Sequence, residues 1–121
     1  MTTRRATCSC GQLAVTVEGD PIRVSMCHCL ACQKRTGAPF GAQARYPRAQ
    51  ARIEGTSKTY ARIGDAGSRI EFQFCPECGS TVHYTMPPAD WIAIPIGAFA
   101  DPTFPAPVFS VYEARRRSLI H

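Results

Sequence analysis

The sequence contains no long apolar run. None of its segments approaches the roughly 18 apolar residues that a membrane-spanning helix needs. The N-terminal stretch MTTRRATCSCGQ has two arginines but no apolar segment behind them, so it lacks the pattern of a secretory signal. Internal repeats, low-complexity tracts and a marked domain boundary are also missing. We therefore expect a cytoplasmic protein without a membrane partner, folded as one domain over residues 1–121.

Helical patterns are scarce as well, and short strands dominate instead. Apolar and polar residues alternate over residues 12–17, 69–74, 81–85, 91–96 and 108–112, a period typical of half-buried strands. Pro95 places the fourth of these strands at a sheet edge or a bulge. One short helix is expected at Leu30–Thr36, ended by Gly37, and a turn or flexible loop at Gly64–Ser68. The sequence therefore predicts a mainly β fold.

Cysteine, in contrast, is abundant. Seven cysteines occur in three groups: Cys8 and Cys10; Cys27, Cys29 and Cys32; Cys75 and Cys78. A reducing cytoplasm makes a disulfide framework a poor explanation for them. The odd number would also leave at least one thiol unpaired. Metal ligation therefore explains the cysteines better.

The segment FCPECGS has the spacing of a zinc knuckle. Two residues separate Cys75 from Cys78, so both sulfurs can converge on one ion, while Gly79 lets the backbone turn beneath it. A redox CxxC motif of thioredoxin type is the alternative, but that motif accompanies a βαβ pattern, which is lacking here.

Cys8 and Cys10 can supply the other half of a tetrahedral site. In an extended segment alternate side chains share a face, so both thiols would point the same way. Together with Cys75 and Cys78 they make a set of four cysteines, the composition of a structural zinc site. An ion held by this set would clip an early strand to a late one and close a long loop, which favours stability.

The remaining group, CHCLAC, offers three thiolates and leaves one corner of a tetrahedron open. Three protein ligands with an open position are typical of catalytic zinc, so Cys27, Cys29 and Cys32 are the candidate catalytic residues. A second structural zinc closed by a distant histidine is the alternative.

The three histidines are weaker candidates as ligands. In an extended backbone His28 would face away from Cys27 and Cys29. His83 lies in an expected strand and is interpreted as a packed or surface residue, and His121 as part of a frayed C-terminus.

Together these motifs resemble the glutathione-dependent formaldehyde-activating enzyme family, whose domain also occurs in centromere protein V. The segments CSCG, CHCLACQKRTG, FCPECGST and IPIGAFADP occur in the family's order and spacing, and the resemblance covers the core of the chain, about residues 7–117. It implies a small, mainly antiparallel β architecture of the Mss4-like type organised around two zinc ions. It also implies a structural ion on Cys8, Cys10, Cys75 and Cys78 and a catalytic ion on Cys27, Cys29 and Cys32.

The activity that the resemblance implies is that of a carbon–sulfur lyase. Such an enzyme joins formaldehyde and glutathione into S-(hydroxymethyl)glutathione, or acts on a related thiol adduct. Glutathione is anionic, and Lys34 and Arg35, next to Cys32, either steer its carboxylates or are simply solvated. Members often carry a histidine where Ser110 stands and a tryptophan where Leu119 stands, and these departures weaken the transfer of the substrate.

A non-catalytic zinc module that binds a protein or nucleic acid is the competing hypothesis, supported chiefly by Arg115, Arg116 and Arg117. The formal net charge is +5, and seven cysteine thiolates holding two zinc ions would reduce it to about +2. The other basic residues are scattered, so we do not expect a nucleic-acid partner. A homodimer is compatible with the sequence.

Overall fold

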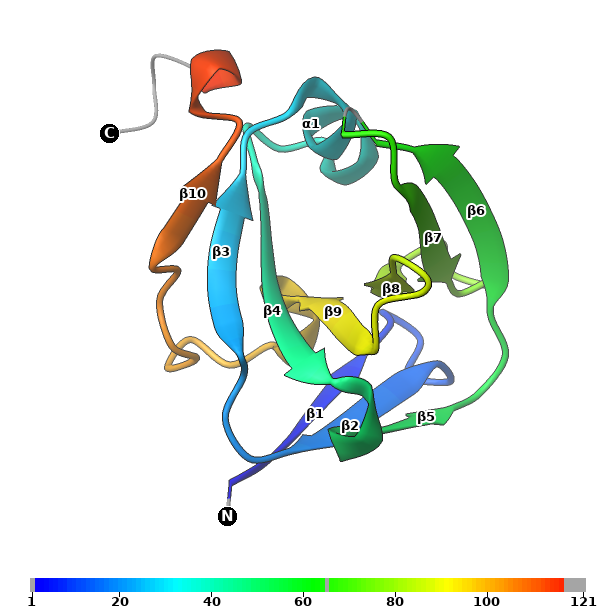
Figure 1. Ribbon diagram of the computed structural model, residues 1–121. Helices are drawn as coiled ribbons and strands as arrows, with labels where there is room; N and C mark the ends of the chain where they lie inside the picture. The colour runs from blue at the N-terminus through cyan, green and yellow to red at the C-terminus, as the bar shows by residue number, and fades with distance from the viewer. Residues whose placement is uncertain (1, 65, 117–121) are drawn as a thin grey trace.

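Ten strands, one α-helix and three short 3-10 helices form the described part of the chain (Figure 1). The structure is a computed structural model that describes residues 2–64 and 66–116. The strands are β1 (Thr3–Thr7), β2 (Ala14–Glu18), β3 (Arg23–Cys27), β4 (Gly41–Pro47), β5 (Ala51–Glu54), β6 (Lys58–Ile63), β7 (Arg69–Phe74), β8 (Thr81–Thr85), β9 (Trp91–Pro95) and β10 (Phe109–Val111). The helices are α1 (Leu30–Thr36), η1 (Arg48–Gln50), η2 (Ile96–Phe99) and η3 (Glu113–Arg115).

The strands form two sheets. One has three strands in the order β1-β2-β5, and the other has seven in the order β10-β3-β4-β9-β8-β7-β6. In Figure 1 the three-stranded sheet lies at the lower end of the molecule and α1 at the upper end. The described strand pairs are antiparallel, with the exception of β10, which runs parallel to β3. The helices of this part of the chain lack the length and apolar character that crossing a membrane would require.

The hydrophobic core lies between the two sheets. Val15 and Val17 of β2 pack in one buried cluster with Tyr46 of β4 and with Ile92 and Ile94 of β9. Full burial of each such aliphatic side chain contributes about 1.5–3 kcal/mol to folding. Because successive strand residues point to opposite faces, the intervening residues of the large sheet face away from this core. They surround a cavity that is described below.

Helix α1 follows β3 closely and turns the chain toward β4. The Cys29 sulfur caps the helix by accepting a hydrogen bond from the backbone N–H of Cys32 at 3.3 Å. At the other end, Gly37 adopts a φ of 68° and its N–H donates to the carbonyl of Gln33. This left-handed backbone favours glycine, because a side chain there would be strained. The predicted helix and its end at Gly37 are confirmed.

Two strand predictions need correction. Pro95 marks neither a sheet edge nor a bulge, since β9 lies between β4 and β8 and the proline is tolerated as its last residue. The alternation over residues 81–85 predicts that Val82 and Tyr84 share one face of the strand. Instead, Val82 belongs to the hydrophobic core, whereas Tyr84 lines the cavity. The β7–β8 register shifts between Gln73 and Phe74, where Val82 lies without a paired residue.

The predicted loop at Gly64–Ser68 is present in its described residues, where the Gly64 N–H donates to the Ser68 carbonyl. The structure also adds strands that the alternation did not reveal: β1, β3, β4, β5 and β6. Several of these contain charged residues on one or both faces, which obscures the two-residue pattern.

Candidate metal centres

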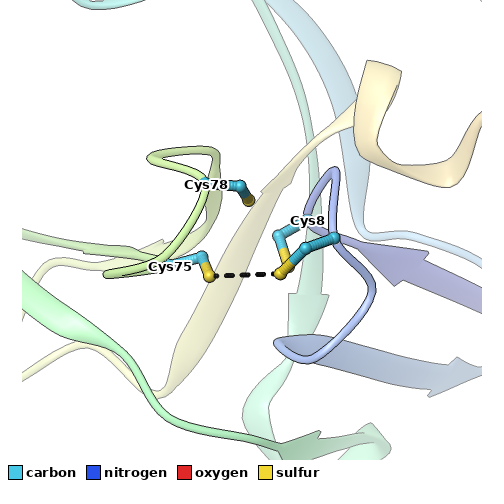
Figure 2. Close-up of side chains that lie close together, drawn as sticks. Cys8, Cys75 and Cys78 are labelled. Carbon is cyan, nitrogen blue, oxygen red and sulfur yellow. Dashed lines mark hydrogen bonds between the residues drawn. The ribbon is translucent and has the colours of Figure 1, made fainter.

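Four cysteines from two distant loops converge into a first cluster. Cys8 and Cys10 come from the β1–β2 loop, and Cys75 and Cys78 come from the β7–β8 loop. Figure 2 shows Cys8 of the first loop facing Cys75 and Cys78 of the second. The four sulfurs lie within 4.8 Å of one another, and Cys10 Sγ is 3.6 Å from both Cys8 Sγ and Cys75 Sγ. Tetrahedral zinc, with Zn–S bonds of about 2.3 Å, requires sulfurs about 3.8 Å apart. The cluster therefore fits a closed zinc site.

The two loops reach this arrangement in different ways. Gly79, with a φ of 81°, lets the Cys75–Ser80 loop turn back, and its N–H donates to the Cys75 carbonyl at 2.8 Å. The segment with Cys8 and Cys10 was expected to be extended, but it forms a tight turn in which the Gly11 N–H donates to the Cys8 carbonyl. The chain has to reverse there, because β1 and β2 are neighbouring antiparallel strands. The Ser9 and Ser80 hydroxyls, 2.9 Å apart, tie the two loops together.

Hydrogen bonds from the protein favour the thiolate form of Cys75 and Cys78, whereas at Cys10 a backbone N–H at Gln12 is outweighed by the neighbouring thiols, which raise its pKa to about 11. The Leu13 N–H donates to Cys8 Sγ at 3.3 Å, and Gln12 Nε2 donates to Cys75 Sγ at 2.9 Å. The backbone N–H of Ser80 is the main cause that lowers the pKa of Cys78 to about 5. Burial opposes ionisation of Cys75, yet the Gln12 amide and nearby backbone N–H groups outweigh it and lower its pKa. Ionised cysteines are the form that binds metals.

A second cluster contains three buried cysteines. Cys27 ends β3, Cys29 caps α1 and Cys32 lies in the first helical turn, so one short segment brings the three sulfurs within 4.8 Å of one another. Hydrogen bonding from Cys27 is the main cause that lowers the pKa of Cys32 to about 5, with help from Arg35. The same contact raises the pKa of Cys27. The geometry offers a metal three ligands rather than four.

The described histidines belong to neither cluster. His28 is buried, and its Nε2 lies 3.0 Å from Ser110 Oγ in β10, so the prediction that it faces away from the cysteines is confirmed. His83 was predicted to be either a packed or a surface residue, and the structure shows that it is buried. His121 lies outside the described residues.

A cavity of about 190 Å³ adjoins the three-cysteine cluster, and we name it the cysteine cavity. Cys27, Cys29 and Cys32 line it together with four arginines: Arg23, Arg35, Arg45 and Arg62. Aromatic side chains complete the wall: Phe72, Tyr84, Trp91 and Tyr112. Burial raises the pKa of Tyr84, so its hydroxyl stays protonated. None of the described lining residues is acidic, and the cavity is therefore strongly cationic.

The aromatic rings position the arginines of this wall. The guanidinium of Arg45 lies 3.8 Å from the Trp91 ring centroid, and that of Arg35 lies 4.8 Å from the Phe72 ring centroid. Cation–π contacts of this kind hold a guanidinium without neutralising its charge. Their positive charge therefore remains available to a ligand.

The two cations that the sequence singled out have different positions. Arg35 lines the cysteine cavity, whereas Lys34 lines a neighbouring hollow beside Tyr60. Arg35 also lines that hollow, so the two cations share the hollow, whereas Arg35 but not Lys34 is among the described lining residues of the cysteine cavity.

Sequence reasoning missed several other lining residues, most notably Arg23, Arg45 and Gln43. A signal existed for Arg23, because a residue four positions before Cys27 in one strand shares its face. Gln43 is buried, and its Nε2 donates to Ser25 Oγ at 2.7 Å, while its Oε1 has no hydrogen-bond partner. A buried acceptor without a partner is costly unless a ligand satisfies it.

The family model for the glutathione-dependent formaldehyde-activating enzyme matches residues 3–115 of the chain. The chain belongs to this family. A solved structure of a Rhodobacter sphaeroides protein has the same fold, with a TM-score of 0.63 and 18% identity, over 88% of this chain and 98% of that chain. No curated protein sequence matches the chain. The mainly β fold that the resemblance implied is thus confirmed.

Membership of the formaldehyde-activating family gives the two cysteine clusters a chemical context. The family's name links it to glutathione and formaldehyde, and both clusters have a geometry that is compatible with metal binding. Of the two departures from the family pattern, Ser110 lies against buried His28, and Leu119 falls outside the described residues.

Proposed function

We propose that the protein is a zinc-dependent carbon–sulfur lyase that joins formaldehyde to glutathione, or to a related thiol, as an S-hydroxymethyl adduct. Cys8, Cys10, Cys75 and Cys78 hold a structural zinc, and Cys27, Cys29 and Cys32 hold a second zinc beside the cysteine cavity. The observation that carries the proposal is the opening of a cationic cavity directly onto the three-cysteine cluster. A cytoplasmic location would keep all seven cysteines reduced.

The substrate's charged groups match the residues of the cavity wall. Zinc, when bound, would favour the thiolate form of the incoming thiol. Arg35 and the three other lining arginines bind its carboxylates, and the amide of Gln43 on the same wall hydrogen-bonds its peptide backbone. Lys34 steers anions from outside the cavity rather than contacting the bound thiol.

The bond changes of the proposed reaction are simple. The thiolate sulfur donates an electron pair to the carbonyl carbon of formaldehyde, and a carbon–sulfur bond forms. The π pair of the carbonyl bond moves to its oxygen, which takes up one proton. Tyr84 offers a protonated hydroxyl on the cavity wall for this transfer. The reverse sequence of steps releases formaldehyde.

Exchange spectroscopy by NMR tests the activity, because adduct formation also has a spontaneous background. The zinc-loaded protein is expected to accelerate exchange between free glutathione and its hydroxymethyl adduct. Cys29→Ser is expected to remove the acceleration, whereas Arg52→Gln, at an exposed arginine paired with Glu54, is expected to retain it. An unaltered background rate with the zinc-loaded protein would contradict the proposal.

The alternative of a non-catalytic binding module draws no support from the described arginines near the C-terminus. Arg116 Nε lies 3.5 Å from a carboxylate oxygen of Glu113, and the guanidinium of Arg115 lies 5.7 Å from the Tyr112 ring centroid. These contacts are internal to the chain. Arg117 lies outside the described residues.

A further inference from the structure

An unusual pair of like charges lines the cysteine cavity. Arg23 of β3 and Arg45 of β4 are direct partners in the antiparallel register, and both side chains line the cavity. Like charges that face each other across two strands destabilise a sheet. The positive charge of Arg23 adds to burial in lowering the pKa of Arg45. The fold therefore carries an electrostatic cost at the point where a ligand would enter.

Among the described residues, the cavity arginines have no carboxylate partner, although Arg35 lies close enough to Cys32 to favour its thiolate. The ion pairs among the described residues involve other arginines: Arg5, Arg52, Arg69 and Arg116. The Nε atoms of Arg23 and Arg35 are buried without a hydrogen-bond partner, although the guanidinium of each lies over an aromatic ring. Buried donors without partners are costly, and the guanidiniums that line the cavity, rather than these two covered nitrogens, are the groups that an anion can contact.

We propose that the cysteine cavity selects a thiol with at least two carboxylates and no ammonium group, in preference to glutathione itself. This inference rests on the proposed function, because it names the substrate class of the same site. The described part of the wall contains four guanidiniums and no acidic side chain. A carboxylate gains charge-assisted hydrogen bonds there, whereas an ammonium loses its hydration and is repelled.

The formal charges support the same selection. Three cysteine thiolates and one bound zinc ion would carry a net charge of −1, so over the described lining residues the four arginines leave a surplus of three positive charges. A thiolate with two carboxylates carries three negative charges and balances this surplus. In glutathione the positive ammonium offsets one of these negative charges, so the bound thiol would leave one positive charge of the site unbalanced. Such an imbalance costs more in a partly dry cavity than in water.

The decisive comparison uses glutathione and glutaryl-cysteinyl-glycine, which keeps both carboxylates, the thiol and the peptide backbone but lacks the amino group. Isothermal titration of the zinc-loaded protein is expected to show about tenfold tighter binding of the deaminated thiol. In Arg45→Gln, and independently in Arg62→Gln, the preference should shrink. In Arg52→Gln, which removes the same charge from an exposed site, it should persist.

The outcomes separate this inference from the proposed function. If glutathione bound as tightly as the deaminated thiol or more tightly, the preference proposed here would be overturned but not the proposed function. If neither thiol bound, both the preference and the proposed function would be overturned. Asp65, between the lining residues Gly64 and Ala66 in the sequence, lies outside the described residues. An Asp65→Asn variant is therefore included: if it weakened the binding of glutathione but not of the analogue, an acid would recognise the ammonium and the inference would fall.

Discussion

Some buried polar side chains in the described part of this protein lack hydrogen-bond partners, which lowers the free energy of unfolding unless a ligand supplies the partner. Gln43 illustrates this, because the residue lines the cysteine cavity and its Nε2 donates to Ser25, while its buried Oε1 has no hydrogen-bond partner. His83 illustrates the opposite case, a buried ring in which both nitrogens lack partners. The first residue belongs to the binding wall, whereas the second affects stability.

Replacing Gln43 by leucine is expected to weaken glutathione binding about three- to tenfold, because one hydrogen bond to the ligand is lost. The fold should tolerate the change, since leucine has a similar size and removes a buried acceptor without a partner. Calorimetry gives the affinity, and Gln50→Leu, at an exposed position in η1, is the matched control. Unchanged affinity in Gln43→Leu would mean that this amide does not contact the ligand.

His83 predicts a specific loss of stability in acid. Burial, with a smaller contribution from Arg48, lowers the pKa of His83 to about 4 in the folded protein, from 6.5. Between these two pH values the unfolded chain binds the proton more strongly than the folded protein does. The free energy of unfolding that neutral His83 supports is therefore fully present above pH 6.5 and is lost as the pH falls toward 4. The loss amounts to about 3 kcal/mol.

Urea unfolding at several pH values measures this loss, with His83→Phe as the reference that cannot titrate. Because metal loss in acid affects both proteins, the difference between them isolates the histidine. Parallel curves for the two proteins from pH 7 down to pH 4 would contradict the assignment.

Among the elements, β10 connects the C-terminal segment to the site. The Val111 carbonyl accepts a hydrogen bond from the His28 N–H at 3.0 Å, and Val24 accepts one from the Val108 N–H at 2.9 Å. Val111 and Tyr112 line the cysteine cavity. A strand of three residues thus forms one wall of the cavity while adding little to the core.

A chain ending at Pro107 is therefore expected to remain folded but to bind glutathione at least tenfold more weakly, because this wall is missing. A chain ending at Arg116 is the matched control, since it keeps β10 and η3. Circular dichroism monitors the fold and calorimetry the affinity. Equal affinity of the two shortened chains would show that β10 does not contribute to the site.

In the molecule as a whole, the four-cysteine cluster connects the two sheets. Its β1–β2 loop belongs to the three-stranded sheet, and its β7–β8 loop belongs to the seven-stranded sheet. The three-cysteine cluster, in contrast, lies within one segment from Cys27 to Cys32. A metal in the first cluster thus stabilises the assembly of the fold, whereas a metal in the second stabilises only a local turn.

Cys75→Ser is accordingly expected to impair folding or solubility, because metal-binding energy at this cluster is also folding energy. Cys29→Ser should give a folded protein that retains one zinc. Circular dichroism with zinc analysis compares the two variants. If Cys29→Ser were the more damaging change, the roles of the two clusters would be reversed.

The two metal ions should also differ in lability. An ion in the four-cysteine cluster would be enclosed by both loops, whereas an ion in the three-cysteine cluster would have three protein ligands and an exchangeable position beside the cavity. Native mass spectrometry during titration with a chelator is expected to show one zinc leaving well before the other. Simultaneous loss of both ions together with unfolding would contradict distinct roles.

The sequence by itself determined the local parts of this protein. The spacing of CPEC and of CHCLAC brings cysteines together within single loops, and a glycine after the helix defines its end. These features depend on a few neighbouring residues, whose geometry the backbone restricts strongly. The grouping of Cys8 and Cys10 with the CPEC loop also followed from counting ligands, although the turn that holds them did not.

Only the tertiary structure decided which arginines face the three cysteines. Arg23, Arg35, Arg45 and Arg62 come from β3, α1, β4 and β6, and their local sequences share no pattern. Their convergence depends on the order and register of strands that are distant in the chain, and on the rings that hold each guanidinium. Burial of the core fixes that register, because a slip of one residue would turn every apolar side chain of a strand away from the core.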